Sequence, residues 1–176
     1  MPEDDMTPTR QEAIRQLLVR AFADTAHRFA TASYWGARPE YRLWIETPDG
    51  TIVAHLDFER RVVGVGDRDI RIAGTGEVAV HPDWQRHGLG RRLMNAFRAV
   101  LRERTPVDFG YLNCLEDVAG FYIAVGWHRT DQPSLRLHPD TGEPTTWTGA
   151  TMILPVRQPL ERWPREETVD LRGMSW

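Results

Sequence analysis

The stretch that decides the fold runs from residue 78 to residue 93 and reads VAVHPDWQRHGLGRRL. Its first residues are β-rich, and from Leu89 onward the apolar residues recur at helical spacing. Gly88 and Gly90 carry no side chain, which lets the backbone approach an anion closely. The start of a helix offers N–H groups without an intrahelical acceptor and the positive end of a dipole. The stretch therefore predicts a strand, a phosphate-binding loop and a helix in succession.

Arginines strengthen this interpretation. Arg86, Arg91 and Arg92 can add charge-assisted hydrogen bonds to a phosphate. Two glycines alone are as typical of an ordinary loop before a helix, so the interpretation depends on the strand and the helix around them.

The rest of the chain alternates between strand and helix patterns. Thr9 and Glu12 fit a capping box at the start of a helix that runs to about Phe22. The Asp49-Gly50 pair indicates a hairpin turn. Further strands are expected at 41–46, 52–63, 70–80 and 109–113, from Trp127, and in a final hairpin that includes 148–156; a short helix is expected at 116–124.

The absence of repeats and linkers predicts one α+β domain over residues 1–176 with a central sheet. Residues 29–39 look like a loop and are a candidate substrate lid. Residues 157–176 form a tail whose aromatic side chains predict that it docks near the substrate site.

Composition limits the partners. A net charge of -3 and a pI near 6.1 give no broad positive field, so we expect no nucleic acid partner. The lone Cys114 and the acidic first residues favour the cytoplasm over secretion. No window approaches the ~20 apolar residues of a membrane span, so no membrane partner is expected. A homodimer is left open.

The run Gln85-Arg86-His87-Gly88-Leu89-Gly90 matches the Q/R-x-x-G-x-G/A signature and follows a V-x-V strand. In these features the chain resembles the GNAT superfamily of N-acetyltransferases. The resemblance implies a twisted mixed β-sheet flanked by helices on both faces, with acetyl-CoA as co-substrate. It also implies the residues that bind this co-substrate: Val78, Ala79, Val80, Gln85, Arg86, His87, Gly88, Leu89, Gly90 and Arg91.

Two residues are candidates for proton transfer. The helix and turn at 119–127 place Tyr122 where the family has a tyrosine, and a hydroxyl near the sulfur can protonate the departing thiolate. The alternative for Tyr122 is simple packing at the edge of the core. Glu77 is the leading carboxylate to take a proton from the acceptor amine.

Over residues 18–176 the chain is similar to aminoglycoside 2'-N-acetyltransferases, and more weakly to the nodulation N-acyltransferase NodA. Both act on an amino group of a sugar. The shared blocks with the first family are Val53-Ala54-His55, Arg60-Arg61, Val78-Ala79-Val80, Pro82-Asp83-Trp84, Phe121-Tyr122, Gly126-Trp127 and Leu154-Pro155-Val156. The NodA-like blocks are Trp35-Gly36-Ala37-Arg38-Pro39-Glu40, Ala54-His55, Arg60-Arg61 and Glu161-Arg162-Trp163-Pro164.

The chain departs from the aminoglycoside family at two positions. Glu77 lies three residues before Val80 instead of four, so it should face the other side of the strand unless a bulge intervenes. Met174 replaces the aspartate that helps to hold a cationic substrate, and only the carboxylate of Trp176 carries over. We expect a substrate with fewer amines, for which kasugamycin is a candidate.

Trp35, His55 and Trp176 are candidate substrate-binding residues. Packing in the core is the alternative for each. Cys114 is expected to be inert, with a cysteine nucleophile as the minor alternative. The histidines show no metal-binding spacing, so no metal is expected.

These features predict an acetyl-CoA-dependent N-acetyltransferase that inactivates an amino-sugar antibiotic by direct transfer and so confers resistance. A NodA-like acyltransferase acting on an amino-oligosaccharide and a non-catalytic acyl-CoA-binding module are the alternatives.

Overall fold

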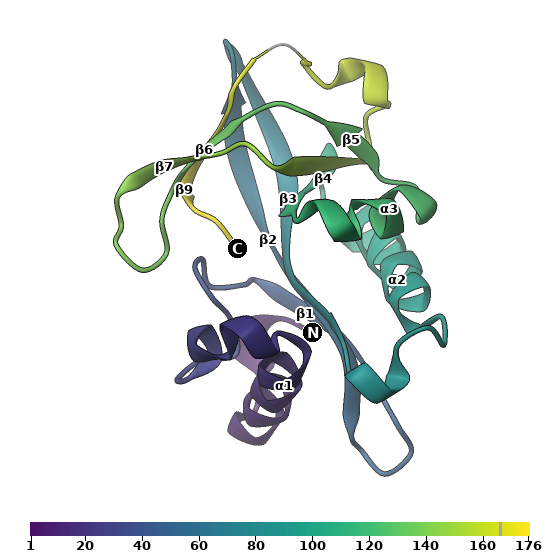
Figure 1. Cartoon of the computed structure of the whole chain (residues 1–176). Helices are drawn as coiled ribbons and strands as arrows, with labels where there is room; N and C mark the ends of the chain where they lie inside the picture. The colour runs from purple at the N-terminus through teal and green to yellow at the C-terminus, as the bar shows by residue number, and fades with distance from the viewer. Residues whose placement is uncertain (166) are drawn as a thin grey trace. The chain divides into compact units, whose positions relative to one another are not determined.

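A computed structural model describes residues 1–165 and 167–176 of the chain, so one residue of the predicted docking tail lies outside the described residues. The chain divides into two compact units, whose elements are shown in Figure 1. Unit 1 comprises residues 1–59, 75–97 and 176, and unit 2 comprises residues 60–74 and 98–175. Three elements continue from one unit into the other: β2 (Ile52–Val65), β3 (Arg68–Val80) and α2 (Leu89–Arg104).

Unit 1 contains the N-terminal helices and the hairpin of β1 and β2. Its other elements are η1 (Glu3–Asp5), α1 (Pro8–Ala21), η2 (Ala23–Phe29), β1 (Tyr41–Glu46) and η3 (Pro82–Trp84). The hairpin is antiparallel and places Arg42 opposite Asp57 and Trp44 opposite His55. This arrangement confirms the turn predicted at Asp49-Gly50.

The predicted start of the first helix is wrong by two residues. The N-cap is Thr7, whose side chain accepts a hydrogen bond from the backbone N–H of Arg10 at 3.2 Å. Pro8 follows at the first helical position, where its missing N–H costs nothing. Thr9 therefore lies inside the helix instead of capping it. The apolar face of α1 packs in a core cluster of Met6, Ile14, Leu17, Leu18, Phe29, Ile52 and Ala79.

Unit 2 is built on a mixed sheet. The strand order of the sheet is β5-β8-β4-β3-β2-β9-β6-β7, with β1 paired to β2. Residues 52–59 of β2 and 75–80 of β3 belong to unit 1. The pairs β3·β4 and β6·β9 are parallel, whereas β2·β9, β4·β8, β5·β8 and β6·β7 are antiparallel. The bounds are β4 (Phe109–Cys114), β5 (His128–Thr130), β6 (Ser134–Leu137), β7 (Pro144–Trp147), β8 (Ala150–Pro155) and β9 (Val169–Met174). The mixed sheet together with the helices confirms the predicted α+β class.

The C-terminal half of the chain differs from the expectation in two ways. The turn at residues 139–142 joins β6 to β7, while the expected strand at 148–156 is β8, which pairs with β4 and β5. The tail contributes η4 (Leu160–Arg162) and an unpredicted strand, β9. The Arg61 guanidinium donates to the carbonyl oxygens of Leu171 and Met174, at 3.1 and 2.7 Å, and holds this strand.

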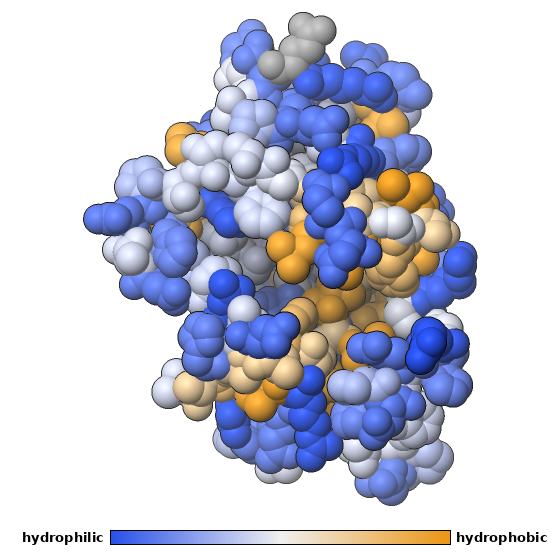
Figure 2. Space-filling model, in the orientation of Figure 1, coloured by the Kyte–Doolittle hydropathy of each residue, from blue (hydrophilic) through white to orange (hydrophobic). Residues whose placement is uncertain are grey.

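The short helix α3 (Glu116–Ala124) has the predicted bounds and an exposed apolar surface. Leu115, Val118, Phe121 and Ile123 are all exposed, and Figure 2 shows hydrophobic side chains in this region. Among the residues that the structure describes, no helix is both long and apolar enough to cross a membrane.

Candidate functional site

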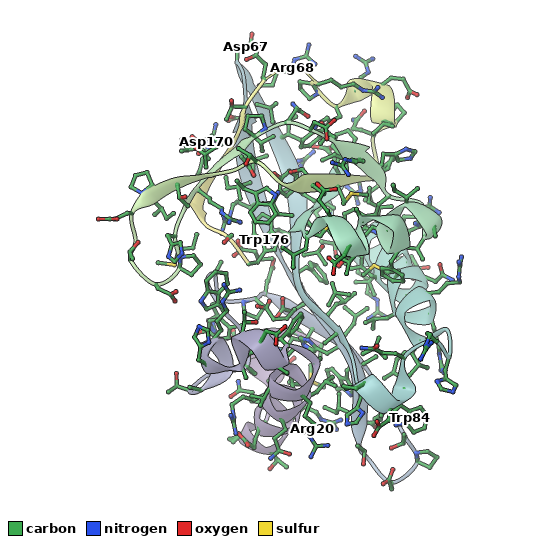
Figure 3. All side chains as sticks on the ribbon, in the orientation of Figure 1. Arg20, Asp67, Arg68, Trp84, Asp170 and Trp176 are labelled. Carbon is green, nitrogen blue, oxygen red and sulfur yellow. The ribbon has the colours of Figure 1, made fainter. Side chains whose placement is uncertain are left out.

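The predicted phosphate-binding loop lies between β3 and α2 in unit 1. Trp84 closes the short helix η3 through its backbone N–H to the carbonyl oxygen of His81, at 2.8 Å. The side chain of Gln85 returns to the carbonyl oxygen of Val80, at 3.4 Å. Arg86 and Gly88 then take positive φ angles of 62° and 78°, which turn the chain sharply into α2. Trp84 is labelled in Figure 3 at the start of this turn.

The loop is open to a ligand. Residues 82–88 are exposed, and a Cβ built on Gly88 would meet no described atom within 4 Å. A glycine is therefore favoured at position 88 by the positive φ of the backbone, and not because a side chain would lack space. The backbone N–H of Arg92 donates to the carbonyl oxygen of Gly88 at 3.0 Å, so the helical ladder begins here. The first turn of α2 can direct N–H groups toward an anion.

A buried cluster of charged residues lies in unit 1 beside the same strand. Arg42, which is 0% exposed, is at its centre. Its guanidinium forms a two-point ion pair with Glu3 and donates to the carbonyl oxygen of Ser33 at 2.8 Å. It also lies 3.7 Å from Asp57 Oδ2. The pattern analysis did not single out Arg42, Glu3 or Asp57.

Glu77 joins this cluster through an irregularity in β3. Its φ of 43° is unusual for a residue with a side chain and breaks the alternation of the strand. Glu77 Oε1 accepts a hydrogen bond from the backbone N–H of Trp35 at 3.1 Å, and its carboxyl group is hydrogen-bonded to Asp57. The strand is thus irregular at the residue for which the sequence left a bulge open.

The two carboxyl groups are raised in pKa by burial. Burial outweighs the attraction of Arg42 and raises the pKa of Asp57 to about 6. Burial and the neighbouring Asp57 charge raise the pKa of Glu77 well above its usual range. Both carboxyl groups therefore hold a proton to a higher pH than exposed carboxyl groups do.

His55 is 0% exposed, and both of its ring nitrogens are engaged. Nδ1 lies 3.1 Å from the carbonyl oxygen of Glu77, so this nitrogen carries the proton, and Nε2 faces the Arg42 guanidinium at 3.5 Å. Burial, together with the Arg42 charge, lowers the pKa of His55 to about 3. The structure therefore favours the core alternative for His55, as a neutral group that supports the backbone of β3.

The two predicted substrate-binding tryptophans both lie in unit 1. The ring of Trp35 is covered by the Arg28 guanidinium, 3.9 Å from its centroid. Trp176, labelled in Figure 3, lies against Gly76, where an added Cβ would be 3.0 Å from the carbonyl carbon of Trp176. The same hypothetical Cβ would be 3.3 Å from Asp57 Oδ1. Trp35, Trp176 and the Asp57–Glu77 pair are thus neighbours within one unit.

Tyr122 lies on α3 in unit 2 and is 8% exposed. Its ring packs edge-on against Trp127, with centroids 5.9 Å apart. Burial raises the pKa of its phenol, which stays protonated at neutral pH. The thiol of Cys114 is also buried, and this raises its pKa to about 11. A thiol in that state is a poor nucleophile, which argues against the cysteine alternative.

The fold defines the class of protein. The chain resembles the GNAT family N-acetyltransferase YhbS of Escherichia coli in complex with CoA, with a TM-score of 0.62, 18% identity and coverage of 94% of this chain and 86% of that chain. It also resembles the ribosomal-protein-S18-alanine N-acetyltransferase of the same organism, with a TM-score of 0.58, 25% identity and coverage of 90% and 96%. The GNAT fold and the predicted class of N-acetyltransferase are confirmed.

Within that class the family is also defined. The Nodulation protein A (NodA) family matches residues 2–175, and the chain belongs to this family. The chain is 24% identical to nodulation protein A of Rhizobium leguminosarum bv. trifolii, over 97% of this chain and 93% of the relative. It is 27% identical to the aminoglycoside 2'-N-acetyltransferase of Mycolicibacterium fortuitum, over 77% of this chain and 66% of the relative. Both predicted resemblances are therefore found, but their order is reversed: the match to NodA covers more of the chain than the match to the aminoglycoside 2'-N-acetyltransferase.

Proposed function

We propose that this protein transfers an acetyl group from acetyl-CoA directly to a primary amine of an amino sugar. The observation that carries the proposal is the open loop at residues 82–88, between β3 and the first turn of α2. Its positive φ angles and free space at Gly88 suit a pyrophosphate bound by helix N–H groups. A relative from Brucella melitensis, with a TM-score of 0.57, has been solved with acetyl-CoA, which supports this co-substrate.

Each group of residues has a separate role in the proposed reaction. Residues 78–80 hold the pantetheine arm, and residues 85–91 hold the phosphates. The carboxyl group of Glu77 receives a proton from the acceptor ammonium, because only the free amine can attack the thioester. Tyr122 donates a hydrogen bond to the departing sulfur. Since its raised pKa keeps the phenol protonated, Tyr122 stabilises the thiolate more than it transfers a proton completely.

For the acceptor we propose the 2'-amine of an aminoglycoside-type antibiotic, with kasugamycin as a candidate. The similarity to an aminoglycoside 2'-N-acetyltransferase supports this choice. Acetylation removes a positive charge that such drugs use to bind ribosomal RNA, so the physiological result would be resistance. The reaction is expected in the cytoplasm.

A second acceptor class is favoured by the family match over residues 2–175. In that case the acceptor is the free amine of an amino-oligosaccharide, and the donor carries a longer acyl chain. The donor distinguishes the two proposals, because acetyl-CoA serves the first and a long-chain acyl carrier serves the second.

A panel of acceptors tests both. The purified protein and acetyl-CoA are incubated with one acceptor at a time: several aminoglycosides, kasugamycin and a chitosan oligomer. Mass spectrometry of the products should show one added acetyl group on an amino-sugar antibiotic. Modification of the chitosan oligomer alone, in the same panel repeated with a long-chain acyl donor, would replace the first proposal by the second. A panel that stays unmodified with either donor would contradict both.

A further inference from the structure

The carboxyl groups of Asp57 and Glu77 are in direct contact within unit 1. They come from neighbouring strands, β2 and β3, and are hydrogen-bonded to each other. Asp57 is 1% exposed, and its Oδ2 atom has no hydrogen-bond partner among the described residues. Two contacting carboxylates in such a place cannot both carry a full charge at low cost.

The surrounding charges do not neutralise the pair. From β1, Arg42 faces Asp57 at 3.7 Å, but its guanidinium is already in a two-point ion pair with Glu3 of η1. From β2, Glu59 adds negative charge near Asp57. Two further ionisable groups lie near the pair. His55 is neutral, and the carboxyl carbon of Trp176 lies beside Gly76 on the side of Asp57 Oδ1, so it adds no positive charge. One positive group thus faces several carboxylates, and a proton held between Asp57 and Glu77 removes the excess negative charge.

The backbone supports a defined geometry for this pair. The φ of 43° at Glu77 is a conformation that costs energy for a residue with a side chain. It directs the carboxyl group between the Trp35 N–H and Asp57. Glu77 is the less buried residue of the two, since Asp57 is 1% exposed, so Glu77 is the member assigned to the acceptor.

We propose that Asp57 and Glu77 share one proton and act as a unit, in which Glu77 meets the acceptor amine and Asp57 is the positioning residue behind it. This inference rests on the proposed acetyl transfer. In the first step an N–H bond of the acceptor ammonium breaks and its proton adds to Glu77, while the proton of Glu77 moves to Asp57. The neutral amine then attacks the thioester: the C–N bond forms, the C–S bond breaks, and the second amine proton neutralises the thiolate.

Infrared difference spectroscopy tests the shared proton without any substrate. The spectrum of the wild-type protein minus that of the Asp57→Asn/Glu77→Gln double variant isolates the pair. This difference should contain the carbonyl band of a protonated carboxyl group, and the band should persist above the pH range in which an exposed glutamate loses its proton. In Asp57→Asn the band should disappear at a lower pH than in the wild type, because the repelling charge and the hydrogen bond of Asp57 are gone. A wild-type band that disappears in the pH range of an exposed glutamate would overturn the inference.

A double-mutant cycle on kcat/KM tests whether Asp57 acts through Glu77. Asp57→Asn should lower kcat/KM about tenfold when Glu77 is present, since an asparagine cannot take up the proton that Glu77 passes on. The same change should have no effect in the Glu77→Gln background. Equal losses in both backgrounds would mean a merely structural role for Asp57 and would overturn the inference.

Controls separate the possible failures. Thermal unfolding and acetyl-CoA binding of each variant show whether it is folded, because breaking a buried ion pair can be costly. If Asp57→Asn does not fold, the spectrum of the wild type minus that of Glu77→Gln still reports the protonated carboxyl. A shared proton in a protein that turns over no acceptor would contradict the proposed function, whereas turnover without the shared proton would contradict the pair alone.

Discussion

At the scale of single residues, chemistry depends on protonation states that burial sets. Glu77 was expected to be a base acting alone, yet its carboxyl group is paired with that of Asp57, and burial raises the pKa of both. The sequence did contain a signal for the buried contact between Arg42 and Asp57. Arg42 and Asp57 are charged residues within apolar strands, at equal separations on either side of the Asp49-Gly50 turn. The positive φ of Glu77, by contrast, follows from packing that no local pattern encodes.

The role of Tyr122 can be tested by removing one oxygen atom. Tyr122→Phe keeps the packing of the ring against Trp127, so the fold should be unchanged. Loss of the hydrogen bond to the departing sulfur should lower kcat about 10²-fold, the range for general acid catalysis. Steady-state kinetics and calorimetric titration of acetyl-CoA would measure both effects. Equal turnover in the variant and the wild type would remove Tyr122 from the mechanism.

At the scale of elements, glycines decide where helices begin and end. The helix α3 ends in a Schellman motif, in which the N–H groups of Gly126 and Trp127 donate to the carbonyl oxygens of Ile123 and Tyr122, both at 3.0 Å. Gly126 has a φ of 88°. Because this signature is local, the bounds of α3 were predicted correctly. The strand β9 was missed because it pairs only with distant strands, β2 and β6.

Two alanine substitutions compare the need for glycine at the end of α3 with that in its interior. Gly126→Ala should destabilise the protein by about 1–2 kcal/mol, because a side chain is strained at positive φ. The added Cβ would also lie 2.5 Å from the Arg98 guanidinium. The matched control Gly120→Ala, where a Cβ meets no described atom within 4 Å, should stabilise by about 0.5–1 kcal/mol. Urea unfolding of both variants gives the signs, and a stable Gly126→Ala would refute this account of the cap.

The proposed binding of acetyl-CoA by the loop before α2 can be tested by placing a negative charge at Gly88. Gly88→Asp places a side chain at a φ of 78° and a negative charge where phosphates are expected. Acetyl-CoA binding should be lost, while thermal unfolding shows whether the variant is folded. Intact binding in calorimetric titration would mean that the co-substrate uses another part of the molecule.

At the scale of the whole molecule, the sequence predicted the fold class and superfamily better than the acceptor. The glycine signature and strand–helix alternation are local, and they sufficed for the GNAT fold. The buried charges around Arg42 bring together η1, β1, β2 and β3, and the acceptor depends on such distant contacts. A single domain over residues 1–176 stays a prediction.

The stability of the whole chain should report the neutral state of His55. Its folded pKa of about 3 lies below the ordinary histidine value of 6.5, so the unfolded chain binds more protons between these values. The contribution of His55 to the free energy of unfolding is fully present above pH 6.5 and is lost as the pH falls toward 3. The loss approaches about 1.4 kcal/mol per pH unit. Asp57 opposes it, because its raised pKa makes the folded state bind more protons between about pH 4 and 6.

A pair of variants isolates the histidine. His55→Asn keeps a donor for the Glu77 carbonyl oxygen but cannot be protonated. Relative to the wild type, its free energy of unfolding should rise by about 1 kcal/mol per unit as the pH falls from 6 to 5. The exposed His128 provides the control, and His128→Asn should show no such change. A constant difference between His55→Asn and the wild type would show that His55 is not neutral in the folded state.

The central claim is that this protein uses the loop at residues 82–88 to present acetyl-CoA to an amino-sugar amine. The most direct test is thiol release from acetyl-CoA, followed with a chromogenic disulfide, for the wild type and Gly88→Asp in the presence of kasugamycin and other aminoglycosides. The account predicts acceptor-dependent thiol release by the wild type and none by the variant. Acetyl-CoA binding without thiol release for any amino-sugar acceptor, or equal release by the two proteins, would contradict it.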